Sequence, residues 1–231
     1  MLIRQRIGWP LLIVAIILPF LTTFILSIPL EAWLAVHHLT FASPFGLLGA
    51  LILSETPFLF WGGLFISRNF PHEPLWRAAH PARYWVLGIL GGIGLSIVLS
   101  AGMTALARWF PQIASNGFSG NISPFVSPVA AHTSASLAVV IIGILIGPLC
   151  EEIFFRGFLY TALRTHWSTL WAIMGSAAIF AAYHMEPASF GVLFIVGVVL
   201  AYVRSRYSLW ASWGTHAGFN AVAFLMLWFM R

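Results

Sequence analysis

The stretch CEEIFFRGF, Cys150–Phe158, places two adjacent glutamates and an arginine inside a long run of apolar residues. The apolar run around it exceeds the roughly 20 residues that a helix needs to cross a bilayer. An ionisable side chain within such a span is costly unless it is paired or faces water. These three residues are therefore the first candidates for a functional site.

The composition of the whole chain points to an integral membrane protein. Of its 231 residues, 60% are hydrophobic and only 7% charged, and the mean hydropathy is +0.94. Such values lie outside the range of water-soluble domains. Eleven arginines and six glutamates give a net charge of +5, with no lysine or aspartate. No basic cluster is interleaved with aromatics in a polar segment, so nucleic acid is not an expected partner. The arginine-only bias suggests a bacterial origin.

Apolar segments recur along the chain with short gaps, which predicts an all-α, polytopic membrane helix bundle. We expect residues 1–231 to form a single membrane domain. Its N-terminal part, residues 1–133, would hold three spans and an outer loop, and residues 134–231 the remaining four spans. The N-terminal apolar run is too long for a signal peptide, so we expect it to be retained. The seven expected spans are Trp9–Leu30, Phe45–Ile66, Tyr84–Leu106, Leu137–Leu163, Trp167–Tyr183, Ala188–Tyr202 and Leu209–Met230.

The arginines test this division independently, because loops left in the cytoplasm are enriched in basic residues. Most arginines outside the spans lie in every second loop, on the same side of the membrane as the N-terminus. This predicts a cytoplasmic N-terminus in a bacterial cytoplasmic membrane. The residues concerned are Arg4, Arg6, Arg68, Arg77, Arg83, Arg164, Arg204 and Arg206, against Arg108 and Arg231 on the other side. The polar stretch PQIASNGFSGNISPFVSPVAAHTSAS, residues 111–136, is expected to be an outer loop.

Helical spacing sorts the charged cluster. Glu152 and Arg156 are four residues apart, so they share a helix face and can form a bidentate ion pair. Glu151 points about 100° away from that pair and has no local partner. A purely structural triad that fixes helix packing stays open as an alternative, but an ion pair needs only one glutamate.

Three more polar residues lie in the later spans. His216 and Asn220 are four apart, so both could reach one substrate carbonyl and donate to its developing charge. Interhelical hydrogen bonding is the alternative for this pair. His184, one turn after Phe180, could instead be an interfacial residue. A rise of about 1.5 Å per residue puts Glu151 roughly 20 Å, His184 roughly 25 Å and His216 roughly 14 Å from their cytoplasmic turns.

Two further residues have weaker assignments. Cys150 is expected to be a buried thiol rather than a nucleophile, since free cysteine is usually buried. Glu55 lies near the middle of the second span, two residues before Pro57. It could touch a cavity or merely satisfy a group freed by the proline kink.

The motifs Glu151-Glu152-x-x-x-Arg156, Phe180-x-x-x-His184 and His216-x-x-x-Asn220 resemble, in order, those of the CPBP family. These are the CaaX protease and bacteriocin-processing endopeptidases, also called Abi or type II CaaX prenyl endopeptidases. The resemblance covers about residues 137–228 and makes residues 134–231 the expected catalytic core.

The resemblance implies an intramembrane protease with catalytic residues Glu151, His184, His216 and Asn220. Glu151 would activate a water, the two histidines would position it or donate protons, and Asn220 would stabilise the oxyanion. Glu152, Arg156 and Phe180 would support them. The family is often named as metalloproteases, and Glu151, His184 and His216 would be the ligands of a zinc ion. The short HExxH spacing is absent, so no cofactor is certain and zinc stays an open possibility.

The expected substrate is a membrane-associated peptide or protein, with the lipid bilayer as the other partner. Bacterial relatives are associated with peptide maturation and bacteriocin processing. One alternative is a non-catalytic membrane immunity or binding protein of the same fold. Another is a proton-coupled transporter with a relay of Glu55, Glu151 and His184, but no interrupted segments repeat in matching halves.

Overall fold

The computed structural model of the protein describes residues 7–110 and 119–229. All regular structure in these residues is helical, as predicted. The elements are α1 (Trp9–Val36), α2 (Pro44–Asn69), α3 (Pro81–Trp109), α5 (Ser119–Ala130), α6 (Ser134–Ile141), η1 (Ile142–Ile146), α7 (Gly147–Glu152), η2 (Ile153–Leu159), α8 (Tyr160–Leu163), α9 (Thr169–Tyr183), α10 (Phe190–Arg206) and α11 (Leu209–Phe229).

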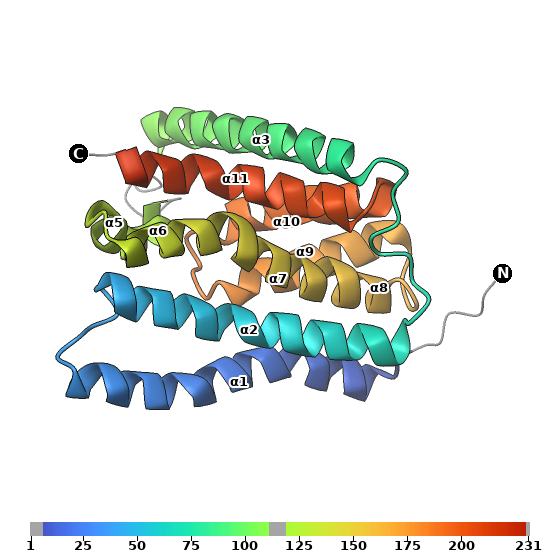
Figure 1. The fold of residues 1–231 in the computed structure, drawn as a ribbon. Coiled ribbons are helices and arrows are strands. Elements are labelled where there is room, and N and C mark those ends of the chain that lie inside the picture. The colour runs from blue at the N-terminus through green and yellow to red at the C-terminus, as the bar shows by residue number, and fades with distance from the viewer. Residues whose placement is uncertain (1–6, 111–118, 230–231) are drawn as a thin grey trace.

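Successive long helices run in opposite directions and form one bundle (Figure 1). The α1–α2 hairpin lies along one edge and α3 along the opposite edge. The elements α6, η1, α7, η2 and α8 form one continuous rod, residues 134–163, between α2 and α11. This rod is the most buried part of the bundle, because neighbouring helices cover it on several sides.

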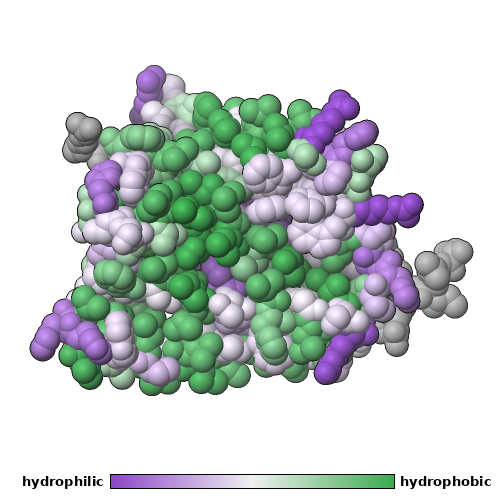
Figure 2. All heavy atoms as spheres, in the orientation of Figure 1, coloured by the Kyte–Doolittle hydropathy of each residue, from purple (hydrophilic) through white to green (hydrophobic). Residues whose placement is uncertain are grey.

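Among the described residues, four helices are long and apolar enough to cross a membrane: Trp9–Val36, Pro44–Asn69, Pro81–Trp109 and Ser134–Leu163. The later predicted spans are also helical, but α9 and α10 have only 15 and 17 residues. Figure 2 shows hydrophobic side chains over the middle of one face and hydrophilic side chains towards its two ends. That distribution matches a protein surrounded by hydrocarbon and bounded by two polar surfaces.

Small residues bring α3 and α11 into unusually close contact. Cβ atoms added at Gly92 or Gly218 would collide with the carbonyl oxygens of Thr215 and Ile89, respectively. Gly88 and Gly214 meet the opposite backbone in the same way. Glycines four residues apart on two facing helices allow backbones to approach closely in membranes. The contact fixes α11, which carries two of the candidate site residues.

One part of the predicted outer loop is helical instead. Residues 119–130 form α5, and the buried side chain of Val129 and the ring of Phe125 pack against the ends of α6 and α11. Phe125 lies edge-on to Phe224, with ring centroids 5.1 Å apart. Tertiary packing therefore overrides the turn propensity of a segment rich in serine, glycine and proline. The beginning of this stretch, residues 111–118, lies outside the described residues.

Candidate active site

The backbone around the two glutamates departs from regular α-helix. Glu151 and Glu152 end α7, which lies between the π-helical segments η1 and η2. In η1 the amide of Gly147 donates to the carbonyl of Ile142, five residues earlier. The next bond in this register would join residue 148 to Gly143, but Pro148 has no N–H to donate. The carbonyl oxygen of Gly143 is therefore left for a partner outside the rod.

Helix α11 supplies that partner. Asn220 Nδ2 donates to the Gly143 carbonyl oxygen at 2.9 Å, and Trp213 Nε1 donates to the Leu145 carbonyl oxygen at 2.9 Å. Because a carbonyl oxygen only accepts, the amide nitrogen of Asn220 must face Gly143. An amide nitrogen carries two hydrogens, so a second N–H is left for a ligand.

The predicted ion pair is present and completely buried. Arg156 lies 3.0 Å from Glu152, and neither side chain is exposed to solvent. The arginine also donates to the Gly197 carbonyl oxygen at 3.3 Å and lies 4.3 Å from the centroid of the Phe180 ring. Phe180, predicted to support the site, therefore packs directly on the buried charge.

A residue that the sequence analysis did not single out completes the environment of Glu152. The Ser212 hydroxyl donates to Glu152 Oε2, and the carbonyl oxygen of Leu200 lies 2.9 Å from the same Oγ. Ser212, His216 and Asn220 recur at intervals of four along α11 and so form one polar stripe. The spacing of four residues from His216 is the feature of the sequence that could have identified Ser212.

His216 connects the two glutamates. Its Nδ1 lies 3.1 Å from Glu152 Oε1, and its Nε2 lies 3.6 Å from Glu151 Oε2. Two acidic and two basic side chains therefore face one another in this cluster. This balance gives the second glutamate a reason, since buried charges are tolerated when they are paired. We call Glu151, Glu152, Arg156 and His216 the buried quartet.

Glu151 is the member of the buried quartet that reaches open space. Its side chain is 16% exposed, against 5% or less for the other three, and it lines a cavity of about 330 Å³. Its neighbour Glu152 points to the opposite side, into the core. The adjacent glutamates therefore have different surroundings, as their angular separation on a helix predicts.

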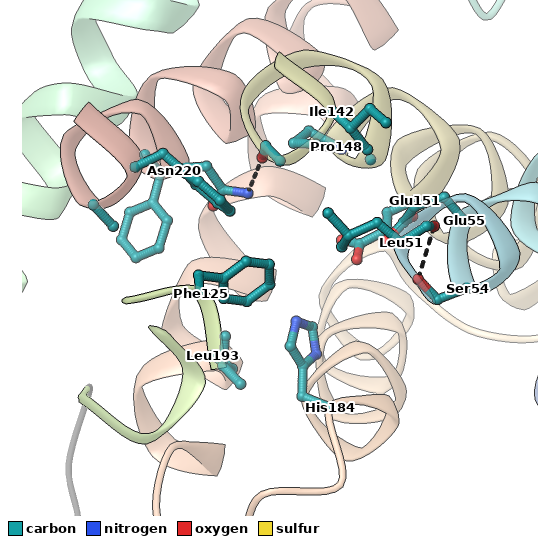
Figure 3. A pocket seen from close by; sticks show the side chains of 15 residues that line it. Leu51, Ser54, Glu55, Phe125, Ile142, Pro148, Glu151, His184, Leu193 and Asn220 are labelled. Carbon is teal, nitrogen blue, oxygen red and sulfur yellow. Dashed lines mark hydrogen bonds between the residues drawn. The ribbon is translucent and has the colours of Figure 1, made fainter. Parts of the chain in front are cut away.

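His184 faces the same cavity from the end of α9 (Figure 3). Its Nδ1 lies 2.9 Å from the Phe180 carbonyl oxygen, and a carbonyl can only accept, so Nδ1 carries the hydrogen. Nε2 of the neutral ring is then a basic nitrogen. A basic nitrogen and a carboxylate face one cavity, which is a suitable pair to bind and deprotonate a water molecule.

The rest of the cavity wall is mainly apolar and comes from α2, α5, η1, α7, α10 and α11. Its polar members besides Glu151 and His184 are Ser54, Glu55 and Asn220. The apolar members are Leu51, Phe125, Ile142, Gly143, Gly147, Pro148, Leu193, Phe219, Ala223 and Phe224.

The structure differs from the sequence-based picture at His216. Asn220 lines the cavity, but His216 is buried behind Glu151 and does not line it. The rise counted from the helix ends separated His216 from Glu151 by one to two turns, yet the two side chains interact. The estimate from the helical rise assumed that all helices start at the same depth in the membrane. Helix α11 can start at a different depth from the others. Cys150 is buried, as predicted.

The residues proposed as zinc ligands do not assemble into a metal site. Among the described residues, no three His, Cys, Asp or Glu side chains come together in a group that could hold an ion. Both ring nitrogens of His216 already face carboxylates, and Nδ1 of His184 faces a carbonyl oxygen. The described side chains therefore do not fit a three-ligand zinc site.

The sequence of this same segment matches a family model. Residues 133–222 match the family described as "Type II CAAX prenyl endopeptidase Rce1-like". We call residues 133–222 the Rce1-like segment, after the family that they match. The Rce1-like segment contains the buried quartet, His184 and Asn220, whereas α1, α2, α3 and α5 lie outside it.

One relative extends the similarity beyond the Rce1-like segment. The chain is 25% identical over 174 residues to "Putative membrane peptidase YdiL" of Bacillus subtilis (strain 168). The aligned part covers 71% of this chain and 65% of that relative, which is just under two thirds of its length. No protein of solved structure matches this chain.

Proposed function

We propose that the protein is an intramembrane endopeptidase that hydrolyses a peptide bond with a water molecule activated by Glu151 and His184. The observation that supports this best is the pairing of one carboxylate and one basic imidazole nitrogen at a cavity within an apolar bundle. The similarity of residues 133–222 to a family of endopeptidases supports the same reaction.

In the proposed reaction, the water oxygen attacks the carbonyl carbon of the substrate. Glu151 accepts a proton from that water, while Nε2 of His184 accepts a hydrogen bond that orients it. His216 holds the Glu151 carboxylate through a contact of 3.6 Å and acts as a positioning residue, because it does not line the cavity.

The second N–H of Asn220 is the proposed donor to the oxyanion. Its first N–H is bonded to Gly143, so the amide is held in place before the charge develops. Preorganised donors of this kind stabilise the transition state strongly. As the C–N bond breaks, the leaving nitrogen needs one proton, which a protonated group at the cavity supplies.

The proposed substrate is a membrane-associated peptide or protein with apolar residues beside the cleaved bond. Most of the cavity wall is apolar, with aromatic rings from Phe125, Phe219 and Phe224. The descriptions of the matched family and relative name a prenyl endopeptidase and a membrane peptidase, and neither mentions bacteriocins. We therefore do not extend the proposal to bacteriocin processing.

The proposed topology has seven crossings, with α9, α10 and α11 joining the four long helices, and a cytoplasmic N-terminus in a bacterial membrane. The end of α2 and the start of α3 lie at the same end of the bundle as the end of α8 (Figure 1). Arg68, Arg83, Arg164 and Arg206 are at these helix ends or at the end of α10. Clustered arginines support a cytoplasmic face there.

The test is cleavage of membrane-anchored peptides by the full-length protein in proteoliposomes. A set of quenched-fluorescent peptides should vary the side chains next to one bond from apolar to charged. We expect cleavage at one defined bond, with preference for apolar neighbours. Glu151→Gln should remove the activity, whereas Glu31→Gln, a matched change at an exposed position on α1, should leave it unchanged.

A second measurement separates catalysis from binding. If the wild-type protein binds these peptides tightly but releases no product, the immunity or binding protein is the better assignment. Size-exclusion and circular dichroism profiles of both variants must match the wild type, so that loss of activity cannot be ascribed to misfolding.

A further inference from the structure

Glu55 enters the cavity from α2, outside the Rce1-like segment (Figure 3). Its carboxyl carbon would lie 3.4 Å from a Cβ atom added at Gly147. Gly147 precedes Glu151 by one helical turn on the same face. The missing side chain at residue 147 therefore leaves room for the Glu55 carboxyl group on the stripe that leads to Glu151. Glu55 and Glu151 line the same cavity.

The surroundings of Glu55 do not offer a counter-charge. The adjacent Ser54 hydroxyl donates to the Leu51 carbonyl oxygen at 3.0 Å, and Glu55 Oε2 is buried without a hydrogen-bond partner in the described residues. No ion pair within residues 7–110 and 119–229 includes Glu55. Arg156 and His216, the basic members of the buried quartet, already face Glu151 and Glu152. A second negative charge beside Glu151 would be repelled, so the neutral acid is the form that fits.

We propose that Glu55 is the catalytic acid of this cavity, and this inference rests on the proposed peptidase function. Glu151 takes the proton of the attacking water, and Glu55 gives its own proton to the leaving nitrogen as the C–N bond breaks. The proton on Glu151 then passes to the Glu55 carboxylate. The net change is one water consumed, one carboxylic acid and one amine formed, and both glutamates restored.

Two carboxyl groups in one cavity with different surroundings are a known arrangement for a base and an acid. Glu151 Oε2 lies 3.6 Å from His216 Nε2, whereas Glu55 Oε2 is buried without a hydrogen-bond partner among the described residues. His184 and the Cys150 thiol are the other titratable groups beside this pair. A structural glutamate at a proline kink would not need to reach the cavity.

The test compares Glu55→Gln, Glu151→Gln and Glu31→Gln on two versions of one membrane-anchored peptide in proteoliposomes. One version has an ordinary amide at the cleaved bond, and the other an ester with a leaving group that needs no proton. General acid catalysis contributes on the order of 100-fold or more. We expect Glu55→Gln to lower kcat for the amide by about 100-fold and to leave KM and ester cleavage near the wild-type values.

The variants test the role of Glu55 separately from the proposed peptidase function. Glu151→Gln should abolish cleavage of both substrates, and if it does not, the proposed function fails. If Glu55→Gln slows amide and ester equally, or slows neither, Glu55 is not the acid. Infrared spectroscopy of the purified proteins provides a measurement that does not need turnover. The carbonyl band of a protonated carboxyl group should be present in the wild type and Glu31→Gln and lost in Glu55→Gln, and its absence from the wild type would overturn the proposal.

Discussion

The side-chain amide of Asn220 donates a hydrogen bond of 2.9 Å to the carbonyl oxygen of Gly143. The bond exists because Pro148 cannot supply the backbone N–H that the π-helical register of η1 requires. A helix defect in one element thus orients a polar side chain of another. π-helical turns often occur at functional sites, and here the turn has a specific consequence.

Pro148→Ala tests this relationship. The new backbone N–H can pair with Gly143, so Asn220 loses its partner and its fixed orientation. We expect the rate of peptide cleavage to fall by at least about tenfold, since misplaced catalytic groups are costly, while the midpoint of thermal unfolding is unchanged or higher. Full activity in Pro148→Ala would show that the Gly143 contact does not position Asn220.

Asn220→Ala, which removes the proposed oxyanion donor, should lower kcat by about 100- to 1000-fold.

Arg156→Leu should destabilise the protein by about 3–5 kcal/mol, because the two glutamates of the buried quartet would keep only His216 as a basic partner in the described residues. The measurement is chemical unfolding in detergent micelles, followed by circular dichroism. Arg206→Leu is the control, since Arg206 is exposed at the end of α10. Equal stability of the two variants would contradict a structural role for the buried ion pair.

Ser212→Ala removes the hydroxyl between Glu152 and the Leu200 carbonyl. A buried acceptor left unsatisfied costs about 1–3 kcal/mol, so we expect a loss of stability in this range. Cleavage should also slow, because Glu152 holds His216 and His216 holds Glu151. Ser205→Ala is a matched control, since Ser205 donates to the Tyr202 carbonyl oxygen, three residues earlier, at 2.7 Å. The prediction fails if both serine variants unfold at the same denaturant concentration.

Gly92→Ala and Gly91→Ala separate the close packing of α3 on α11 from helix propensity. A methyl group at residue 92 would collide with the Thr215 carbonyl, whereas residue 91 faces open space. Overpacking typically costs about 1–3 kcal/mol, so Gly92→Ala should be less stable than the wild type by at least that amount. Gly91→Ala should be neutral or slightly stabilising. Similar unfolding curves for the two variants would mean that the helices can move apart freely.

Chelation should not inhibit cleavage. The described histidine and acidic side chains do not group into an ion site, and both nitrogens of His216 face carboxylates. The measurement compares initial rates before and after dialysis against a strong chelator, together with elemental analysis of the purified protein. Loss of activity that added zinc restores would contradict this expectation.

The spacing of residues within one helix correctly predicted which side chains share a face, whereas the estimated depth in the membrane did not predict which helices bring their side chains together. The interval of four residues correctly pairs Glu152 with Arg156, and the single step separates Glu151 from them. The same reasoning would have found Ser212, four residues before His216, but a serine in a membrane helix is unremarkable by itself. Relations between helices depend on where each helix begins in the bundle, which spacing within one helix does not encode. The cavity wall and the position of Glu55 therefore needed the structure.

The segment that forms α5 shows the other limit. Its serines, glycines and prolines indicate a loop, and only the packing of Phe125 and Val129 on neighbouring helices makes it helical. The apolar runs, in contrast, are read directly from composition. Each of the seven predicted spans contains a helix among the described residues, and four of these helices are long and apolar enough to cross a membrane. The helical structure of a long apolar segment can thus be predicted from its own sequence, whereas that of a short polar segment depends on the residues that it contacts.

The most direct measurement is the rate of cleavage of one defined peptide bond by the wild-type protein and by Glu151→Gln, in the same proteoliposomes, with products identified by mass spectrometry. The proposed mechanism predicts two product peptides from the wild type and a decrease in rate of at least about 100-fold in the variant. Cleavage of the same bond at the same rate by both proteins would contradict the assignment of Glu151 as the base, and with it the proposed active site.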